Sequence, residues 1–153
     1  IWAPEVRDFV YISDKAYTRE QILQMEKLIL NTLKFQLTLP TPYTFLTRYH
    51  KAVKANKETE QLSNFFLELA LPEYNMLKYP APLLAAGAVY AAVRTANSRS
   101  SASPWTSTFD AHCPGYTEDE VLTVARQMCA LHAKQATASL VAVNKKYSSD
   151  KFG

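Results

Sequence analysis

Residues 82–96 read Pro-Leu-Leu-Ala-Ala-Gly-Ala-Val-Tyr-Ala-Ala-Val-Arg-Thr-Ala, the pattern of a helix that is buried on all sides. Alanine and glycine are interspersed with larger apolar residues and leave no polar face, so neighbouring helices can approach closely. The apolar run from Leu83 to Val93 spans about 16 Å as a helix, whereas a bilayer requires about 20 residues. We therefore expect this helix at the centre of a helical domain, with no space for a larger side chain at Gly87 or Ala88.

Six further segments on both sides of this helix carry helical signals, and no segment shows the two-residue period of a strand. Thr18 and Thr117 each open a helix with a capping box, T-x-x-Q or T-x-x-E. Pro42, placed directly after Thr41, marks another helix start. The sequence predicts an all-α fold with helices at residues 4–12, 18–35, 42–53, 61–71, 82–96, 117–134 and 137–147. A proline-containing linker at 35–42 and a polar connection at 97–115 join them.

The composition of the 153 residues excludes several classes of function. Only three glycines occur, at positions 87, 115 and 153, so the chain cannot form a glycine-rich phosphate-binding loop. The net charge of +3 is mild and evenly spread, unlike the basic stripe of a nucleic-acid groove. Two cysteines cannot form a disulfide framework and favour a reducing compartment. No secretory signal opens the sequence, and the missing initiator methionine suggests a fragment or a processed product.

Several separated motifs carry a resemblance to a known family. Residues 1–14 read Ile-Trp-Ala-Pro-Glu-Val-Arg-Asp-Phe-Val-Tyr-Ile-Ser-Asp, and residues 16–26 read Ala-Tyr-Thr-Arg-Glu-Gln-Ile-Leu-Gln-Met-Glu. Together they closely resemble the end of the first cyclin box of mitotic cyclins. The motif at 33–43, Leu-Lys-Phe-Gln-Leu-Thr-Leu-Pro-Thr-Pro-Tyr, resembles that family's linker, and motifs at 83–90, 115–120 and 143–153 extend the likeness. The chain is most similar to the B-type, or G2/mitotic, cyclins.

The resemblance implies a fold and a function. Residues 1–38 would be the last two helices of a truncated first cyclin box, and residues 39–153 a complete five-helix second box. The chain would be a regulatory subunit that binds and activates a cyclin-dependent kinase at the G2/M transition, in the nucleus and cytoplasm. It would need no cofactor and bind neither nucleic acid nor a membrane. The family's destruction-box tail, substrate-docking patch and kinase-contacting lysine belong to an upstream part without a counterpart here.

Glu26 is the first candidate for a partner-binding residue. Its neighbours three and four positions away are all apolar, so it has no helical ion-pair partner: Ile22, Leu23, Ile29 and Leu30. A carboxylate on an apolar surface is costly unless a group outside the helix pairs with it. From the pattern alone, Glu26 can also be a rim residue that reaches solvent. The resemblance instead implies that Glu26 pairs with the upstream lysine and touches the kinase's regulatory helix.

The resemblance implies a kinase-binding role for four more residues. Leu30, Phe35 and Leu37 match family positions that pack on the same kinase helix, and Lys27 is a weaker candidate. Periodicity alone makes such apolar residues more often core, although one helix can serve both purposes. In the family, this contact holds the regulatory helix inward, which fixes the kinase's Lys–Glu pair and frees its activation loop. Without the upstream helices, we expect residues 1–35 to bare an apolar face while residues 42–148 fold stably.

Cysteine and histidine residues favour neither a metal centre nor a catalytic pair. A zinc site needs four ligands, and adjacent His112 and Cys113 cannot readily both reach one ion with Cys129 and His132. Cys–His catalysis also needs a group that orients the histidine, and none is signalled. We expect Cys129 to be a small core residue. The acidic residues 118–120 suit the helix dipole, and Lys145 and Lys146 have the pattern of a solvated face.

A second class of function stays open from the sequence. Paired cyclin folds also occur in general transcription initiation factors that sit on promoter DNA, and a salt-sensitive affinity for duplex DNA would support that class. The mild charge and the placement of Glu26 count against it. An enzyme ranks third, because the sequence has neither a glycine-rich loop nor a convincing nucleophile–base pair.

Overall fold

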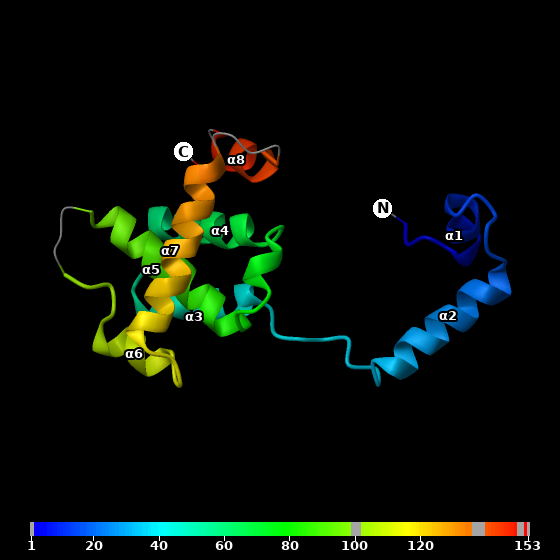
Figure 1. Cartoon of the computed structure of the whole chain (residues 1–153), viewed down its shortest axis with the longest axis horizontal. Coiled ribbons are helices and arrows are strands. Elements are labelled where there is room, and N and C mark those ends of the chain that lie inside the picture. Colours follow the sequence, from blue (N-terminus) through cyan, green and yellow to red (C-terminus); the bar gives the residue numbers. More distant parts are fainter. Residues whose placement is uncertain (1, 99–101, 136–139, 150–151, 153) are drawn as a thin grey trace. The chain divides into compact units, whose positions relative to one another are not determined.

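The structure, a computed structural model, describes residues 2–98, 102–135, 140–149 and 152. All regular elements in this part of the chain are helical, which confirms the all-α prediction. The chain divides into two compact units, Ile1–Leu39 and Pro40–Gly153, and each is described by itself below (Figure 1). Among the described residues, no helix combines the length and the hydropathy that a membrane span requires.

The first unit contains two helices, α1 (Val6–Ile12) and α2 (Arg19–Thr32), that pack on each other. The capping box predicted for α2 is confirmed, because Gln21 N–H donates to Thr18 Oγ1 at 3.3 Å and Thr18 N–H donates to Gln21 Oε1 at 2.8 Å. The predicted start of the first helix at Pro4 is too early, because Glu5 is the residue that caps α1. The predicted end of α2 at Phe35 is too late, because left-handed residues follow Leu33.

The second unit contains α3 (Pro42–Ala52), α4 (Lys57–Ala70), the short 3-10 helix η1 (Tyr74–Met76), α5 (Ala81–Ala96), α6 (Ser107–His112), α7 (Glu118–Lys134) and α8 (Ala142–Tyr147). The five predicted helices correspond to α3, α4, α5, α7 and α8. The predicted start of the last helix at residue 137 lies outside the described residues.

Two segments of the second unit differ from the sequence-based expectation. The polar stretch 57–60 is not a connection but the first turn of α4, because Asn56 Oδ1 accepts from Thr59 N–H at 2.9 Å and caps the helix. The expected connection at 97–115 contains α6, which Thr106 caps by accepting from Phe109 N–H at 3.2 Å. The buried Phe109 side chain anchors this short helix to the core, and no local sequence pattern predicts this contact.

Helix α5 lies at the centre of the second unit, in contact with α3, α4 and α7 (Figure 1). Residues 85–92 of α5 are all buried, which confirms the prediction of a helix surrounded by others. At Gly87, an added Cβ would lie 2.6 Å from Val124 Cγ1 and 3.3 Å from the backbone nitrogen of Ala125. The small residues of α5 therefore allow α7 to pack directly against its backbone.

Three helices end in a left-handed residue that is not glycine. Asp14, Lys34 and Lys54 have φ of 52°, 50° and 50° and follow the last residues of α1, α2 and α3. At α3, Lys54 N–H donates to the Lys51 carbonyl at 3.3 Å and Ala55 N–H donates to the His50 carbonyl at 2.9 Å. This pair of bonds is a Schellman motif, in which glycine is the favoured residue at the left-handed position.

Replacing Lys54 with glycine is expected to stabilise the second unit. A non-glycine residue in the left-handed region costs about 1–2 kcal/mol in the folded chain, and glycine avoids this cost. Glycine also gives the unfolded chain more conformational freedom, which offsets part of the gain in stability. We expect a net gain of about 0.5–1 kcal/mol in the free energy of unfolding, measured by urea denaturation. The matched control Lys51→Gly, inside α3, should lose about 1 kcal/mol. A Lys54→Gly variant that is no more stable than the parent would contradict the assignment of Lys54 to the left-handed position of a Schellman motif.

Candidate functional site

The first unit exposes an apolar surface formed by α1 and α2. No residue of either helix is buried, and large apolar side chains such as Met25, Leu28 and Ile29 are at least half exposed. Side chains from both helices line an open groove of about 860 Å³, among them Val6, Phe9, Tyr17, Ile22, Met25 and Ile29. An apolar surface of this kind is typical of a protein–protein contact.

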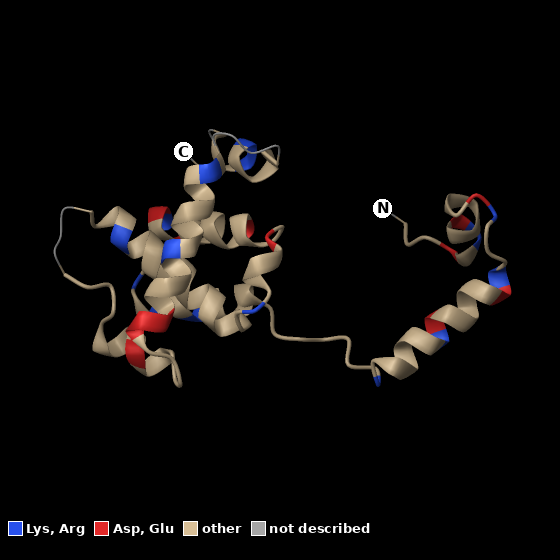
Figure 2. Cartoon of the chain, viewed as in Figure 1, with Lys and Arg blue, Asp and Glu red and all other residues tan. Residues whose placement is uncertain are grey.

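Glu26 lies in the lining of this groove. Within α2, Glu26 and Lys27 are the charged residues between the first turn and the end of the helix, and they form the charged band near its middle (Figure 2). Glu26 is exposed and has no hydrogen bond or ion pair within the part of the chain that the structure describes. Its carboxylate is therefore available to a cation from outside the first unit. The neighbouring Lys27 is exposed and does not line the groove.

The structure places the other three candidate residues in two locations. Leu30 is half-buried and lines the groove together with Glu26. Phe35 and Leu37 follow the end of α2, where they are 65% and 61% exposed and do not line the groove. Phe35 has φ of 57°, and its N–H donates to the Leu30 carbonyl at 2.9 Å. Phe35 and Leu37 are therefore not core residues of the first unit, and their partner-binding role stays a prediction.

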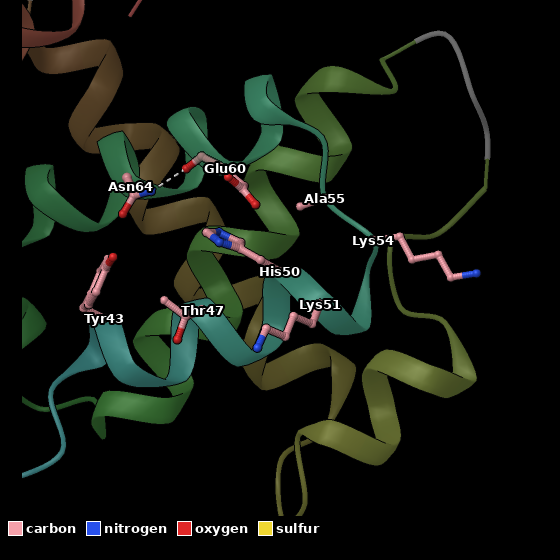
Figure 3. A pocket seen from close by; sticks show the side chains of 8 residues that line it. All are labelled: Tyr43, Thr47, His50, Lys51, Lys54, Ala55, Glu60 and Asn64. Carbon is pink, nitrogen blue, oxygen red and sulfur yellow. Dashed lines mark hydrogen bonds between the residues drawn. The ribbon is translucent and has the colours of Figure 1, made fainter.

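A second, smaller pocket in the second unit surrounds His50 on α3. Its volume is about 370 Å³, and Figure 3 shows His50 between Thr47 on its own helix and Glu60 and Asn64 on α4. His50 Nε2 lies 2.6 Å from Ser63 Oγ. The Ser63 hydroxyl donates its proton to the Glu60 carbonyl at 3.0 Å. Ser63 is fully buried, so its hydroxyl cannot reach a substrate. The pair is a polar contact that ties α3 to α4, and not a nucleophile with its base.

The sequence alone indicates no role for His50. The residue that could have revealed its role is Ser63, a polar residue on the buried face of α4, where Thr59, Phe66 and Leu67 lie three or four positions from it. A buried hydroxyl needs a hydrogen-bond partner, and a histidine is one of the side chains that can provide it.

The stability of the second unit is expected to decrease in mild acid because of His50. Burial lowers the pKa of His50 from its ordinary value of 6.5, and the charge of Glu60 opposes this only in part. The unfolded chain therefore takes up the proton at a higher pH than the folded chain. The free energy of unfolding should have its full value above pH 6.5, fall as the pH decreases below that value, and level off below the folded pKa.

Urea denaturation of the parent chain and of His50→Gln at pH 7.5 and about 5.5 checks this expectation. The variant lacks the titrating group, so its stability should change less than that of the parent over this interval. Equal changes in the two proteins would show that His50 titrates alike in the folded and unfolded chains.

The two cysteines differ in burial, and the expectation for Cys129 is not met. Cys129 on α7 is exposed, so its assignment as a core residue is wrong, whereas Cys113 after α6 is buried. Burial raises the pKa of the Cys113 thiol to about 11, which makes this cysteine a poor nucleophile. The described residues contain no group of three or more histidine, cysteine or acidic side chains that is arranged to hold a metal ion.

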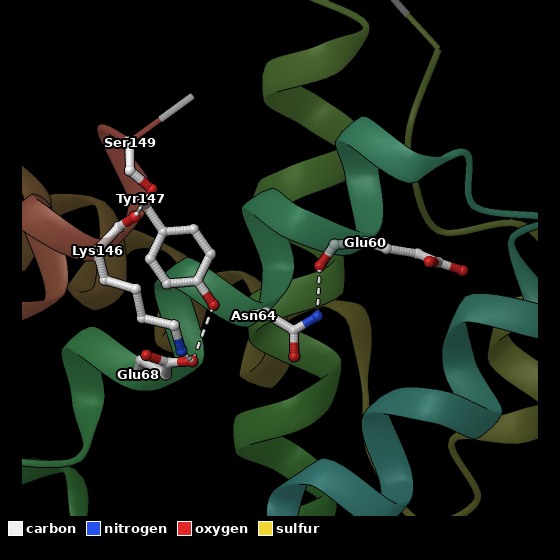
Figure 4. Close-up of polar contacts among 6 residues, drawn as sticks. All are labelled: Glu60, Asn64, Glu68, Lys146, Tyr147 and Ser149. Atoms are coloured by element: carbon white, nitrogen blue, oxygen red, sulfur yellow. Dashed lines mark hydrogen bonds and ion pairs between the residues drawn. The ribbon is translucent and has the colours of Figure 1, made fainter. Parts of the chain in front are cut away.

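Lys146 and Tyr147 of α8 converge on Glu68 of α4 (Figure 4). Lys146 Nζ forms an ion pair with Glu68 Oε1, and the Tyr147 hydroxyl donates to the same oxygen at 2.8 Å. Lys145 and Lys146 are both exposed, as expected for a solvated face, and Lys146 in addition makes this ion pair. The partner lies 78 positions away in the sequence, so no local pattern could reveal it.

Comparisons with known proteins agree with the division of the chain into two units. The family described as Cyclin, C-terminal domain, matches residues 40–153, and the family described as Cyclin, N-terminal domain, matches residues 1–38. The chain is 48% identical to Cyclin-B2-1 of Arabidopsis thaliana, over 98% of this chain and 34% of that protein. It is 49% identical to Cyclin-B2-1 of Oryza sativa subsp. japonica, over 98% of this chain and 35% of that protein. With G2/mitotic-specific cyclin-2 of Medicago sativa the identity is 44%, over 97% and 44% of the two chains. The chain thus spans less than half of the length of these curated relatives.

Proposed function

Because the chain belongs to the cyclin family, we propose that it is part of a regulatory subunit that binds and activates a cyclin-dependent kinase. The similarity to B2-type and G2/mitotic cyclins supports a role at the G2/M transition. We further propose that the protein acts in the nucleus and cytoplasm. The observation that carries the proposal is the carboxylate of Glu26, which lies in a mostly apolar groove and has no partner among the described residues.

The proposed mechanism is positional, and the chain contributes no catalytic group to it. The groove offers apolar side chains from α1 and α2 to a helix of the kinase, and each Å² of apolar surface buried contributes about 25 cal/mol. Glu26 then needs a cation from the complex, because a carboxylate left unpaired in a desolvated contact is costly. This requirement sets the position of the bound helix along the groove, whereas apolar contacts alone would allow it to slide.

Calorimetric titration of the chain with a cyclin-dependent kinase tests the proposal. We expect saturable binding with a negative change in heat capacity, the signature of apolar burial. Ile29→Glu, in the groove, should weaken binding, whereas the matched control Leu77→Glu, at an exposed apolar position of the second unit, should leave it unchanged. Equal weakening by both variants would place the kinase contact elsewhere.

The nucleic-acid alternative gains no support from the structure. Lysine and arginine residues are scattered over the helices of both units, and Figure 2 shows acidic residues among them. Titration with duplex DNA at 50 and 200 mM salt separates the two classes, because a protein that contacts several phosphates loses affinity steeply over about this range. Strong, salt-sensitive DNA binding without kinase binding would overturn the proposed function.

A further inference from the structure

Two of the eight prolines directly follow a serine or threonine, in the dipeptides Thr41–Pro42 and Ser103–Pro104. A serine or threonine followed by proline is the minimal acceptor pattern of proline-directed protein kinases. Proline also keeps the preceding residue in the extended conformation that a kinase active site accommodates. The sequence treats the two dipeptides as equivalent, and the structure distinguishes them.

Thr41 lies in an open, extended segment. Residues 36–41 have no regular secondary structure, and all of residues 31–41 are exposed. Thr41 itself has φ of −77° and ψ of 161°, and its side chain does not cap α3. Its hydroxyl has no partner among the residues that the structure describes, so nothing holds it away from a phosphoryl donor. Pro42 is half-buried at the first position of α3. Because proline has no N–H, opening this turn breaks no hydrogen bond donated by Pro42.

Ser103 is held in place by its own hydrogen bonds and by the packing of the two residues that follow it. Its hydroxyl donates to Glu118 Oε1 at 2.6 Å and accepts from Trp105 N–H at 3.0 Å. Pro104 is buried, and the Trp105 ring packs against Phe109 with ring centroids 5.3 Å apart. A kinase would have to break a hydrogen bond to a charged group and extract the proline before Ser103 could react.

We propose that Thr41 is a phosphoacceptor site for a proline-directed serine/threonine kinase, and that Ser103 is protected by its contacts. In the reaction, Thr41 Oγ1 attacks the γ-phosphorus of magnesium-bound ATP. The bond from phosphorus to the bridging β–γ oxygen breaks, ADP leaves, and the hydroxyl proton passes to the kinase's catalytic base. The product carries about −1.5 to −2 charges at neutral pH.

The added phosphate would act on the start of α3. Thr41 is the N-cap residue of α3, and the first turn of this helix contains no acidic residue. A phosphate placed there is favoured by the helix dipole. Phosphorylation should therefore strengthen the start of α3.

Phosphorylation of the full chain by a purified proline-directed kinase with Mg·ATP, followed by mass spectrometry of peptides, tests the proposal. We expect the initial rate at Thr41 to exceed that at Ser103 by at least about tenfold, because local opening must precede reaction at Ser103. Thr41→Val should abolish the main product, Thr41→Ser should retain it, and Pro42→Ala should reduce it strongly. Glu118→Ala removes the acceptor for Ser103 and should raise labelling at Ser103 alone.

A synthetic peptide of residues 36–47 provides the control for kinase competence. Labelling of Thr41 in both peptide and chain supports the proposal. Labelling of the peptide but not the chain would show that the fold protects Thr41, and labelling of neither would show that its flanking residues are not accepted. Either result would overturn the proposal, as would equal rates at Thr41 and Ser103.

Discussion

Gly87→Ala is expected to lower the free energy of unfolding of the second unit by about 1–3 kcal/mol, the usual cost of overpacking a core. Alanine is the better helix former by about 1 kcal/mol, so helix propensity alone predicts the opposite sign. The structure reverses the sign because the added Cβ would lie 2.6 Å from Cγ1 and 2.9 Å from Cβ of Val124. Val124 is fully buried and has a stiff, branched side chain, so it cannot move aside. Urea denaturation of the chain measures the change.

The double variant Gly87→Ala with Val124→Ala tests the cause of this loss. Val124→Ala alone leaves a cavity and should destabilise the core, but it also removes the Cγ1 atom that the new methyl group meets. The double variant should therefore be more stable than the sum of the single effects predicts, by about 1 kcal/mol or more. Ala130→Gly, at an exposed position of α7, calibrates helix propensity. If Gly87→Ala were as stable as the parent, α5 and α7 would not be in close contact at this position.

The parts of the fold that the sequence predicted well are those that depend on neighbouring residues. The capping boxes at Thr18 and Thr117 involve partners three positions away, and both are present with reciprocal hydrogen bonds. The burial of α5 was predictable because alanine, glycine and apolar residues occupy every side of the helix. In these cases the local sequence contains all the groups that make the interaction.

The misassigned elements depend on contacts between distant residues or on unusual backbone conformations. Helix α6 has six residues, too few for a periodic pattern, and forms because Phe109 reaches the core. Lys34 follows the end of α2 in a conformation that favours glycine, so no residue type marks the end of this helix. Cys129 follows the buried Met128 on α7 but lies on the exposed side, a difference of one helical position.

The candidate binding surface was predictable in part. The isolation of Glu26 among apolar neighbours can be read from the sequence, and the structure adds that Glu26 and Leu30 line one groove. The groove itself could not be predicted, because Val6 and Phe9 of α1 contribute to it through a tertiary contact. The positions of Phe35 and Leu37 follow from the left-handed turn after α2. This turn could not be predicted, because no glycine marks it.

Glu26→Ala is expected to weaken kinase binding by about 2–5 kcal/mol, the typical cost of truncating one partner of a desolvated charge pair. This corresponds to a loss of affinity of about 30-fold or more. The structure motivates the expectation because Glu26 lines the apolar groove and has no partner in the described part of the chain. Glu26→Gln, which keeps the shape but not the charge, should lose most of the same affinity.

The measurement is a calorimetric titration with a cyclin-dependent kinase, made in a chimera that joins this chain to the upstream part of a B2-type cyclin. The chimera supplies the lysine that the family resemblance pairs with Glu26, so the charge pair can form. Glu20→Gln, at an exposed position in the first turn of α2, is the matched control and should leave the affinity unchanged. Circular dichroism of each variant separates loss of binding from loss of helix. Equal affinity of Glu26→Ala and the parent would make Glu26 a solvated rim residue, and the kinase would then be held by the apolar side chains of the groove alone.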